Sequence, residues 1–202
     1  NQSETTTKGL VRRVLTTFNG ASSVAIILGL VAFGILAPGL SPWDPNEPDI
    51  YVTLGMPDAL HWFGTDSAGR DVFTRLAVST QFSILTSLVA VVVAILLGVI
   101  AGLIAGYFGG WFDSLSSWAS SILMALPGLV VLLAAIAVIG PSMWYSMAIF
   151  GVLMSPAYFR LVYTTVRGVR NELYVDAARV SGLGDLRIIS RHILGVVRAP
   201  II

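Results

Sequence analysis

The residue types most able to do chemistry are concentrated between positions 61 and 75. Here Gly-Thr-Asp is followed by Gly-Arg-Asp, a glycine-rich pattern that at first suggests a phosphate cradle. No Gly-Lys-Ser/Thr follows, so the segment is not a P-loop. The pattern instead predicts a helix that begins at Ser67 with Asp66 as its N-cap, carrying an Asp71–Arg75 ion pair at i,i+4 spacing.

The residue types present give little support for a metal site, a disulfide or a catalytic site. The chain has no cysteine, which excludes disulfides and thiolate metal sites. His61 is not expected to be a metal ligand, because the only other histidine, His192, is predicted on the opposite side of a membrane. Intramembrane proteolysis would need a serine near a histidine, or paired aspartates, and the long apolar segments contain neither His nor Asp. We expect no catalytic residue, no metal and no cofactor.

The elements that carry these residues are dominated by apolar helices. Only 11% of the 202 residues are charged, against about 25% in a soluble domain. No Lys, Arg, Asp or Glu occurs in residues 14–43, 76–112 or 114–159. A membrane-spanning helix needs about 20 mostly apolar residues. The first two runs therefore hold one span each, and the third holds two, with a turn at 140–141.

These runs predict an all-α, polytopic membrane bundle forming a single domain over 1–202. The expected spans are 24–40, 83–107, 115–139 and 143–163, joined by an external loop 41–81 and followed by a cytoplasmic loop 164–197. Pro127 lies inside the third span and should kink it. The final residues resemble entry into another apolar segment, so the chain is expected to be part of a longer one.

Charge sets the expected orientation. Basic residues flank the bundle at both ends, whereas the segment between the first two spans is acidic, and positive loops stay in the cytoplasm. Both basic ends then face the cytoplasm and the acidic segment faces outward. The residues concerned are Lys8, Arg12 and Arg13 before the first span, seven arginines at 160, 167, 170, 179, 187, 191 and 198, and the acids Asp44, Glu47, Asp49, Asp58, Asp66 and Asp71.

A stripe of small residues runs along the second span at every fourth position. Side chains four apart share a helix face, and small ones let another backbone approach closely. The stripe predicts either an interface with another subunit or packing against a later span of the same chain. It consists of Ala90, Ala94, Gly98, Gly102 and Gly106.

The basic loop 164–197 is predicted to form two short helices separated by Gly182. On the first, Leu173, Tyr174, Ala177, Ala178 and Ser181 are expected on one mostly apolar face, with Glu172, Asp176 and Arg179 opposite. Asp185 can cap the second helix, which places Leu186, Ile189, Ile193 and Val197 on one side. Such a pair suits either docking to a protein or lying on lipid headgroups.

Five motifs in order resemble the second (C-type) permease subunit of dipeptide, oligopeptide and nickel ABC importers. They are Ala37-Pro38 with Trp43-Asp44-Pro45, Gly64-Thr65-Asp66-x-x-Gly69-Arg70-Asp71, Ala105-Gly-Tyr-Phe-Gly-Gly-Trp111-x-Asp113, Ala125-Leu126-Pro127, and an EAA-like loop, Asp176-Ala177-Ala178 followed by Gly182. This chain departs from the family with Asp176 for Glu and Gly195 for Pro. It also has Ser79, Gln81, Trp118 and Ser121 where the family often has Gly, Arg, Arg and Asp.

The resemblance implies a type I importer permease fold of six spans, two of them beyond those seen here. It implies coupling to the ATPase through Leu173, Asp176, Ala177, Ala178, Gly182 and Asp185. Apart from the resemblance, Ala94, Gly98, Gly102 and Gly106 predict helix packing or a subunit interface. The break at Pro127 predicts either a kink beside a translocation path or simple curvature of the helix. The implied partners are a second permease, two cytoplasmic ATPases, an extracytoplasmic binding protein and membrane lipid, with no nucleic acid.

The implied function is transport of di- or oligopeptides across a bacterial plasma membrane, with ATP hydrolysis left to the partners. The alternatives are import of nickel, glutathione or another small solute, and, in another class, a membrane scaffold whose basic loop binds headgroups.

Overall fold

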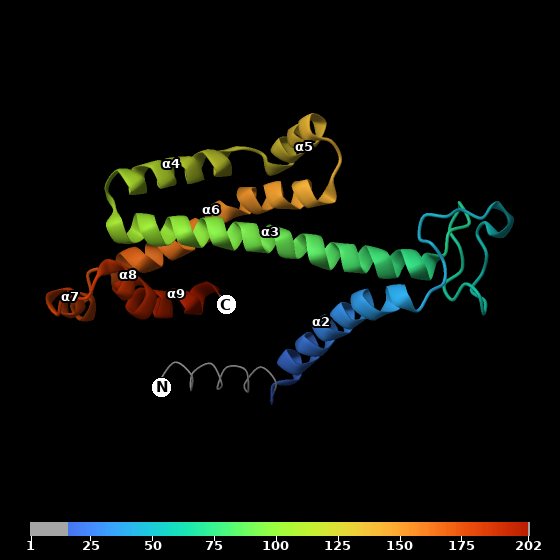
Figure 1. Ribbon diagram of the computed structural model, residues 1–202, viewed down its shortest axis with the longest axis horizontal. Helices are drawn as coiled ribbons and strands as arrows, with labels where there is room; N and C mark the ends of the chain where they lie inside the picture. Colours follow the sequence, from blue (N-terminus) through green and yellow to red (C-terminus); the bar gives the residue numbers. More distant parts are fainter. Residues whose placement is uncertain (1–15, 202) are drawn as a thin grey trace. The chain divides into compact units, whose positions relative to one another are not determined.

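The computed structural model describes residues 16–201, and every regular element in that range is a helix or helical turn (Figure 1). The all-α prediction is confirmed. The predicted basic cluster Lys8, Arg12 and Arg13 lies outside the described residues, as do the side chains of Arg179, Arg191, His192 and Arg198. The elements are α2 (Phe18–Leu36), η1 (Ala37–Gly39), η2 (Ile50–Val52), α3 (Val72–Phe108), α4 (Gly110–Ala125), α5 (Gly128–Ile139), α6 (Met143–Val169), α7 (Leu173–Val180), α8 (Asp185–Ile188), the π-helical turn η3 (Ile189–Ile193) and α9 (Leu194–Ile201).

Three of these helices are long and apolar enough to cross a membrane. They are α2 with η1, α3 and α6; the pair α4 and α5 makes a fourth if it is counted as one broken span. Pro127 lies at the break, where Leu126 and Pro127 are both extended and the two helices meet at 89°. The break is sharper than the kink expected from sequence, because Pro127 begins a new helix as the N-cap of α5.

The chain forms two compact units, residues up to Leu85 and residues from Thr86 onward, with the division inside α3. In the first unit, α2 packs on the beginning of α3 through Phe33, Ala37, Phe73 and Ala77. Gly34 is buried there, and a Cβ on it would lie 3.3 Å from the backbone of Gln81.

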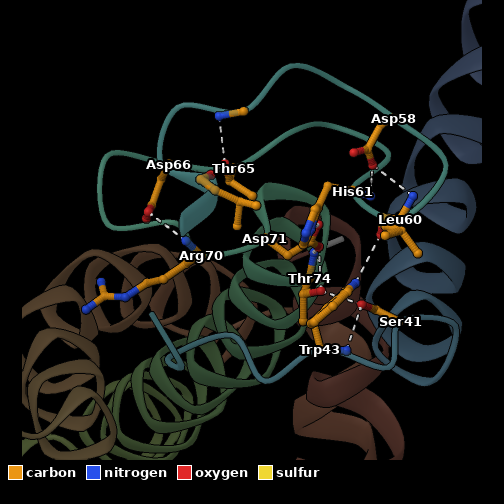
Figure 2. A network of polar contacts seen from close by, with 12 residues as sticks. Ser41, Trp43, Asp58, Leu60, His61, Thr65, Asp66, Arg70, Asp71 and Thr74 are labelled. Atoms are coloured by element: carbon orange, nitrogen blue, oxygen red, sulfur yellow. Dashed lines mark hydrogen bonds and ion pairs between the residues drawn. The ribbon is translucent and has the colours of Figure 1, made fainter. Parts of the chain in front are cut away.

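The 41–71 segment of the first unit is held by hydrogen bonds around Asp71 (Figure 2). Asp71 caps α3 by accepting from the Thr74 amide at 2.7 Å and its hydroxyl at 2.6 Å. Its other oxygen lies 3.0 Å from His61 Nδ1, and Trp43 stacks on the His61 ring. Burial alone would raise the pKa of Asp71, but these hydrogen bonds from Thr74 and His61 outweigh it and the pKa is lowered.

Two sequence predictions for this segment are wrong. No helix begins at Ser67; Asp66 instead closes a turn by accepting from the amides of Ala68 and Arg70. Arg75 pairs with Asp66 at 3.7 Å rather than with Asp71. The reason is Gly69, whose φ of +77° breaks a helix and whose Cβ, if present, would lie 1.7 Å from the Asp49 carbonyl oxygen.

In the second unit, α3 and α6 run parallel with their backbones close together. A Cβ on Gly98 would lie 2.6 Å from the Ser155 carbonyl oxygen, and one on Gly102 would lie 2.9 Å from the Phe159 carbonyl oxygen. A Cβ on Gly106 would likewise lie 2.9 Å from Val166 Cβ. Residue numbers therefore rise in the same direction along both helices at the contact. The small-residue stripe therefore packs within the chain at these three glycines, and Ala94 is buried as well.

The helices between α3 and α6 return along the pair. Both α4 and α5 pack on α6 (Figure 1). The α4–α6 contact includes the Tyr163 hydroxyl, which donates to Asp113 at 3.0 Å. Pro156 interrupts the α6 ladder, and the Ser155 hydroxyl satisfies the carbonyl of Val152, which Pro156 leaves unpaired, at 2.7 Å.

Candidate functional site

The helices that follow α6, residues 173–201 and here called the knob, fold onto the ends of α3 and α6. Their contact is a buried apolar core, which at roughly 1.5–3 kcal/mol per buried Val or Ile side chain is ample to hold short helices in place. The core comprises Val175 and Ala178 of α7, Ile188 of α8, Ile193 of η3, Val197 of α9, Val162 and Val166 of α6, and Tyr107 of α3.

Tyr107 also makes the polar contacts of this core. It is 5% exposed, and its hydroxyl donates to Asp185 Oδ1 at 2.5 Å. Its carbonyl accepts from Arg170 Nη1 at 3.1 Å, at the end of α6. Asp185 was expected to cap α8; it lies instead one residue inside the helix, with Gly184 as the N-cap. Its carboxylate is thereby directed to Tyr107 and still lies in the first turn, which favours negative charge.

Of the residues predicted to share one apolar face of α7, four are exposed and Ala178 alone is buried. Leu173 is 86% exposed and Ala177 is exposed, whereas Val175 and Ala178 face the core. Tyr174 and Ser181 are exposed too. Partial desolvation of the Tyr174 phenol raises its pKa, and the negative charge of Glu172 adds to the effect. Asp176, expected opposite, is exposed as well. A helix of eight residues with one buried face offers several partial apolar stripes, and long-range packing decides which one is covered.

In the second helical segment of the knob, from α8 to α9, the first buried residue is not the one predicted. Ile193 and Val197 are fully buried and Ile189 is partly buried, but Leu186 is 83% exposed and Ile188 takes the buried place. The π-helical turn η3 explains the change. A π-turn adds one residue to a turn, so the residue above Ile193 on the same face is five positions earlier, not four.

Gly182 ends α7 as the sequence predicted. Its φ is +78°, and the Leu183 amide bonds back to the Ala178 carbonyl at 3.1 Å. This is a Schellman-type C-terminus, in which the left-handed residue is usually glycine. Only the turn geometry requires glycine here, since nothing lies within 4 Å of the position that a Cβ would occupy at Gly182.

Sequence reasoning missed Tyr107, Val175 and Ile188. Tyr107 lies within the Ala105-to-Asp113 motif, so its position was marked, but its partner in the knob is far away in the sequence. Nothing in the sequence distinguishes Val175 and Ile188 from the neighbouring apolar residues.

The arrangement is a set of paired apolar helices with a compact helical knob on their ends. Residues 98–202 match the family of binding-protein-dependent transport system inner membrane components. The chain belongs to this family. It is accordingly a multi-pass membrane permease of the ABC transporter class, with the type I importer permease fold.

Curated relatives of this permease include transport proteins for small peptides. It is 36% identical over 181 residues to the probable D,D-dipeptide transport system permease protein DdpC of Escherichia coli K12, covering 90% of this chain and 61% of the relative. It is 37% identical over 177 residues to the dipeptide permease DppC of Alkalihalophilus pseudofirmus, covering 88% and 58%. The glutathione permease GsiD of Escherichia coli O1:K1 is 32% identical over 174 residues, covering 86% and 57%. The permease chain thus spans about three fifths of the length of these relatives.

Proposed function

We propose that this permease forms half of the translocation pore of an ATP-driven importer, and that the knob couples the pore to a cytoplasmic ATPase. A second permease completes the pore, two ATPases bind beneath it, and an extracytoplasmic binding protein delivers the solute. The permease itself carries no ATP chemistry in this proposal. ATP-driven closure of the ATPases moves the knob, and the pore changes from inward- to outward-facing.

The observation that carries the proposal is the division of the knob into a buried and an exposed apolar side. Val175 and Ala178 hold α7 to the bundle, whereas Leu173, Val180 and Leu186 are 86%, 89% and 83% exposed. Binding of a partner that covers such exposed apolar side chains lowers the free energy of the complex. Ala177 and Asp176 lie among them on the exposed side.

Peptides are the proposed cargo because of the relatives. Two of the relatives are named for dipeptides, and a third for glutathione. Nickel or another small solute is the alternative within the same mechanism. Purified binding protein from the same complex, tested for binding to a dipeptide, to glutathione and to Ni²⁺, distinguishes these cargoes.

A lipid-facing knob is the alternative in another class, since exposed apolar residues next to arginines also suit a membrane surface. Affinity purification of the full-length protein in mild detergent separates the two functions. Recovery of a second permease and an ATPase supports the importer. Recovery of the permease alone, from a preparation in which a known importer remains assembled, supports the scaffold.

Two variants test the coupling role of α7 in the reconstituted complex. Ala177→Glu places a charge on the exposed face, and Gly182→Pro cannot adopt the observed φ of +78°. Both should uncouple ATP hydrolysis from transport while membrane insertion is retained. Ala177→Ser and Gly184→Ala are the controls, because Gly184 has a φ of −68° and open space around it. Unchanged transport in both test variants contradicts the proposal.

A further inference from the structure

A short stretch of backbone connects the knob to α6, whereas no short stretch of backbone connects the knob to α3. Only residues 170–172 separate α6 from α7, and the Glu172 amide bonds back to the Val169 carbonyl at 3.1 Å. A displacement of the knob therefore reaches α6 directly along the backbone. It reaches α3 only through non-covalent contacts: Val99 and Leu103 pack against the shared core, and Tyr107 in the last turn is a member of that core. Among these residues Tyr107 also makes a polar contact with the knob.

Tyr107 makes these contacts in three directions. Its ring is buried in the core shared by the knob and α6, its hydroxyl donates to Asp185 in the first turn of α8, and its carbonyl accepts from Arg170 at the end of α6. A hydrogen bond to a carboxylate is shorter and stronger than one between neutral groups, and it is directional. The last turn of α3 is thus fixed to both α6 and α8.

We propose that Tyr107 is the residue through which the knob moves α3, so that α3 and α6 shift as one body when the ATPases act. This rests on the coupling role proposed above. The glycine contacts at Gly98, Gly102 and Gly106 bring the α3 and α6 backbones close together, so a force applied at the end of the pair is not lost by sliding of side chains. Tyr107 is a positioning residue, since it touches neither solute nor nucleotide in this scheme.

Tyr107→Phe isolates the hydroxyl, because phenylalanine keeps the ring in the core. In the full-length reconstituted complex, we expect transport per ATP hydrolysed to fall about fivefold or more, the lower end of coupling between linked sites. Asp185→Leu should have the same effect from the other side of the bond. The double variant should be no worse than either single variant, since both remove one interaction.

Two further variants separate this role from a merely structural one. Asp185→Asn keeps an acceptor oxygen and should retain most of the coupling. Tyr163→Phe removes a similar tyrosine–aspartate bond, which joins α6 to Asp113 of α4 and not to the knob. It should leave the coupling ratio unchanged. Melting temperatures and ATPase co-purification show whether each variant folds and assembles.

A distance measurement reports the motion itself. Spin labels are placed at Ile100→Cys on α3 and Ser181→Cys on the knob, both exposed positions. The 202 residues contain no cysteine, and any cysteine elsewhere in the full-length complex is replaced by serine. In the otherwise wild-type complex the distance should remain the same with and without ATP. With Tyr107→Phe it should change between these states.

The outcomes are distinct. If Ala177→Glu and Gly182→Pro uncouple transport but Tyr107→Phe and Asp185→Leu leave both coupling and distance unchanged, the role of Tyr107 is refuted and the coupling role of the knob stands. If none of the four variants affects coupling, the proposed function itself fails.

Discussion

At the scale of single residues, Asp71 shows how one carboxylate organises a long irregular segment. It caps α3, binds His61 and, through Thr74, reaches the hydroxyl of Ser41. Segments that are distant in sequence thus meet at one buried group, 4% exposed. A buried carboxylate requires such partners, because an unpartnered charge in this environment is very costly.

The lowered pKa of Asp71 predicts a pH dependence. A group that is more acidic in the folded state contributes stability above its unfolded pKa, near pH 4, and loses it as pH falls through the folded pKa. Hydrogen bonding also lowers the pKa of Asp58 and Asp66. The contribution of these carboxylates to the stability of the 41–71 segment should therefore be fully present down to about pH 5 and be lost below about pH 4.

Trp43 fluorescence measures the resulting loosening of the segment, in full-length protein in which every other tryptophan is replaced by phenylalanine. Trp43 stacks on His61 and donates to the Leu60 carbonyl, so its emission should shift when the network opens. Asp71→Asn is the control, since it cannot titrate, and its transition should be weaker. A transition centred above pH 5 would contradict the assignment to these carboxylates.

Residue-level prediction from sequence worked where a constraint is local. Gly182 was identified as a helix end because a left-handed residue after a short helix is usually glycine. Asp66 was recognised as a capping residue, whereas Asp71, which caps α3, was assigned to an ion pair with Arg75. The choice depends on Gly69 meeting the Asp49 backbone, a contact from a remote part of the chain.

At the scale of elements, the contact between α3 and α6 depends on the absence of side chains. A Cβ at Gly98 would lie 2.6 Å from both the Ser155 carbonyl oxygen and Tyr158 Cβ. Gly98→Ala should therefore destabilise the permease by about 1–3 kcal/mol, the usual cost of overpacking. Thermal aggregation of the purified protein in detergent measures the change.

Gly168→Ala is the matched control for that substitution. Gly168 lies in α6, and nothing lies within 4 Å of the position that its Cβ would occupy. Alanine is a better helix former than glycine by about 0.5–1 kcal/mol, so this variant should be as stable as wild type or slightly more so. Equal melting temperatures for the Gly98 and Gly168 variants would show that the glycine contact has no energetic importance.

Helices were predictable from composition, but their register and ends were not. Charge-free runs located the apolar helices because a charge inside a membrane is costly. The π-turn η3 could not be foreseen from an apolar pattern that assumes 3.6 residues per turn, and it changed the buried residue from Leu186 to Ile188. The exposed face of α7 likewise followed from packing rather than from propensity.

At the scale of the whole molecule, the parallel course of α3 and α6 constrains how the chain crosses the membrane. Two consecutive parallel spans require the intervening chain to return across the same thickness. The structure describes every residue between these two helices, and α4 and α5 are the helices found there. We therefore infer that α4 and α5 together make one crossing despite the 89° bend. A re-entrant loop, which turns back to its own side, would leave α6 antiparallel to α3.

The parallel course of α3 and α6 predicts on which sides of the membrane two loops lie. Position 47 and position 181 are separated by three crossings, which are α3, the pair α4 and α5, and α6. The two positions should therefore lie on opposite sides of the membrane. The 202 residues contain no cysteine, so in a full-length protein whose remaining cysteines are serine, Glu47→Cys and Ser181→Cys, both exposed, can be labelled singly with a membrane-impermeant maleimide. In intact cells Glu47→Cys should react and Ser181→Cys should not, and in inverted vesicles the pattern should reverse. Val162→Cys, fully buried, should react in neither. Labelling of both loops from one side would mean that α4 and α5 do not cross, and it would place the knob away from any cytoplasmic ATPase if that side is the outer one.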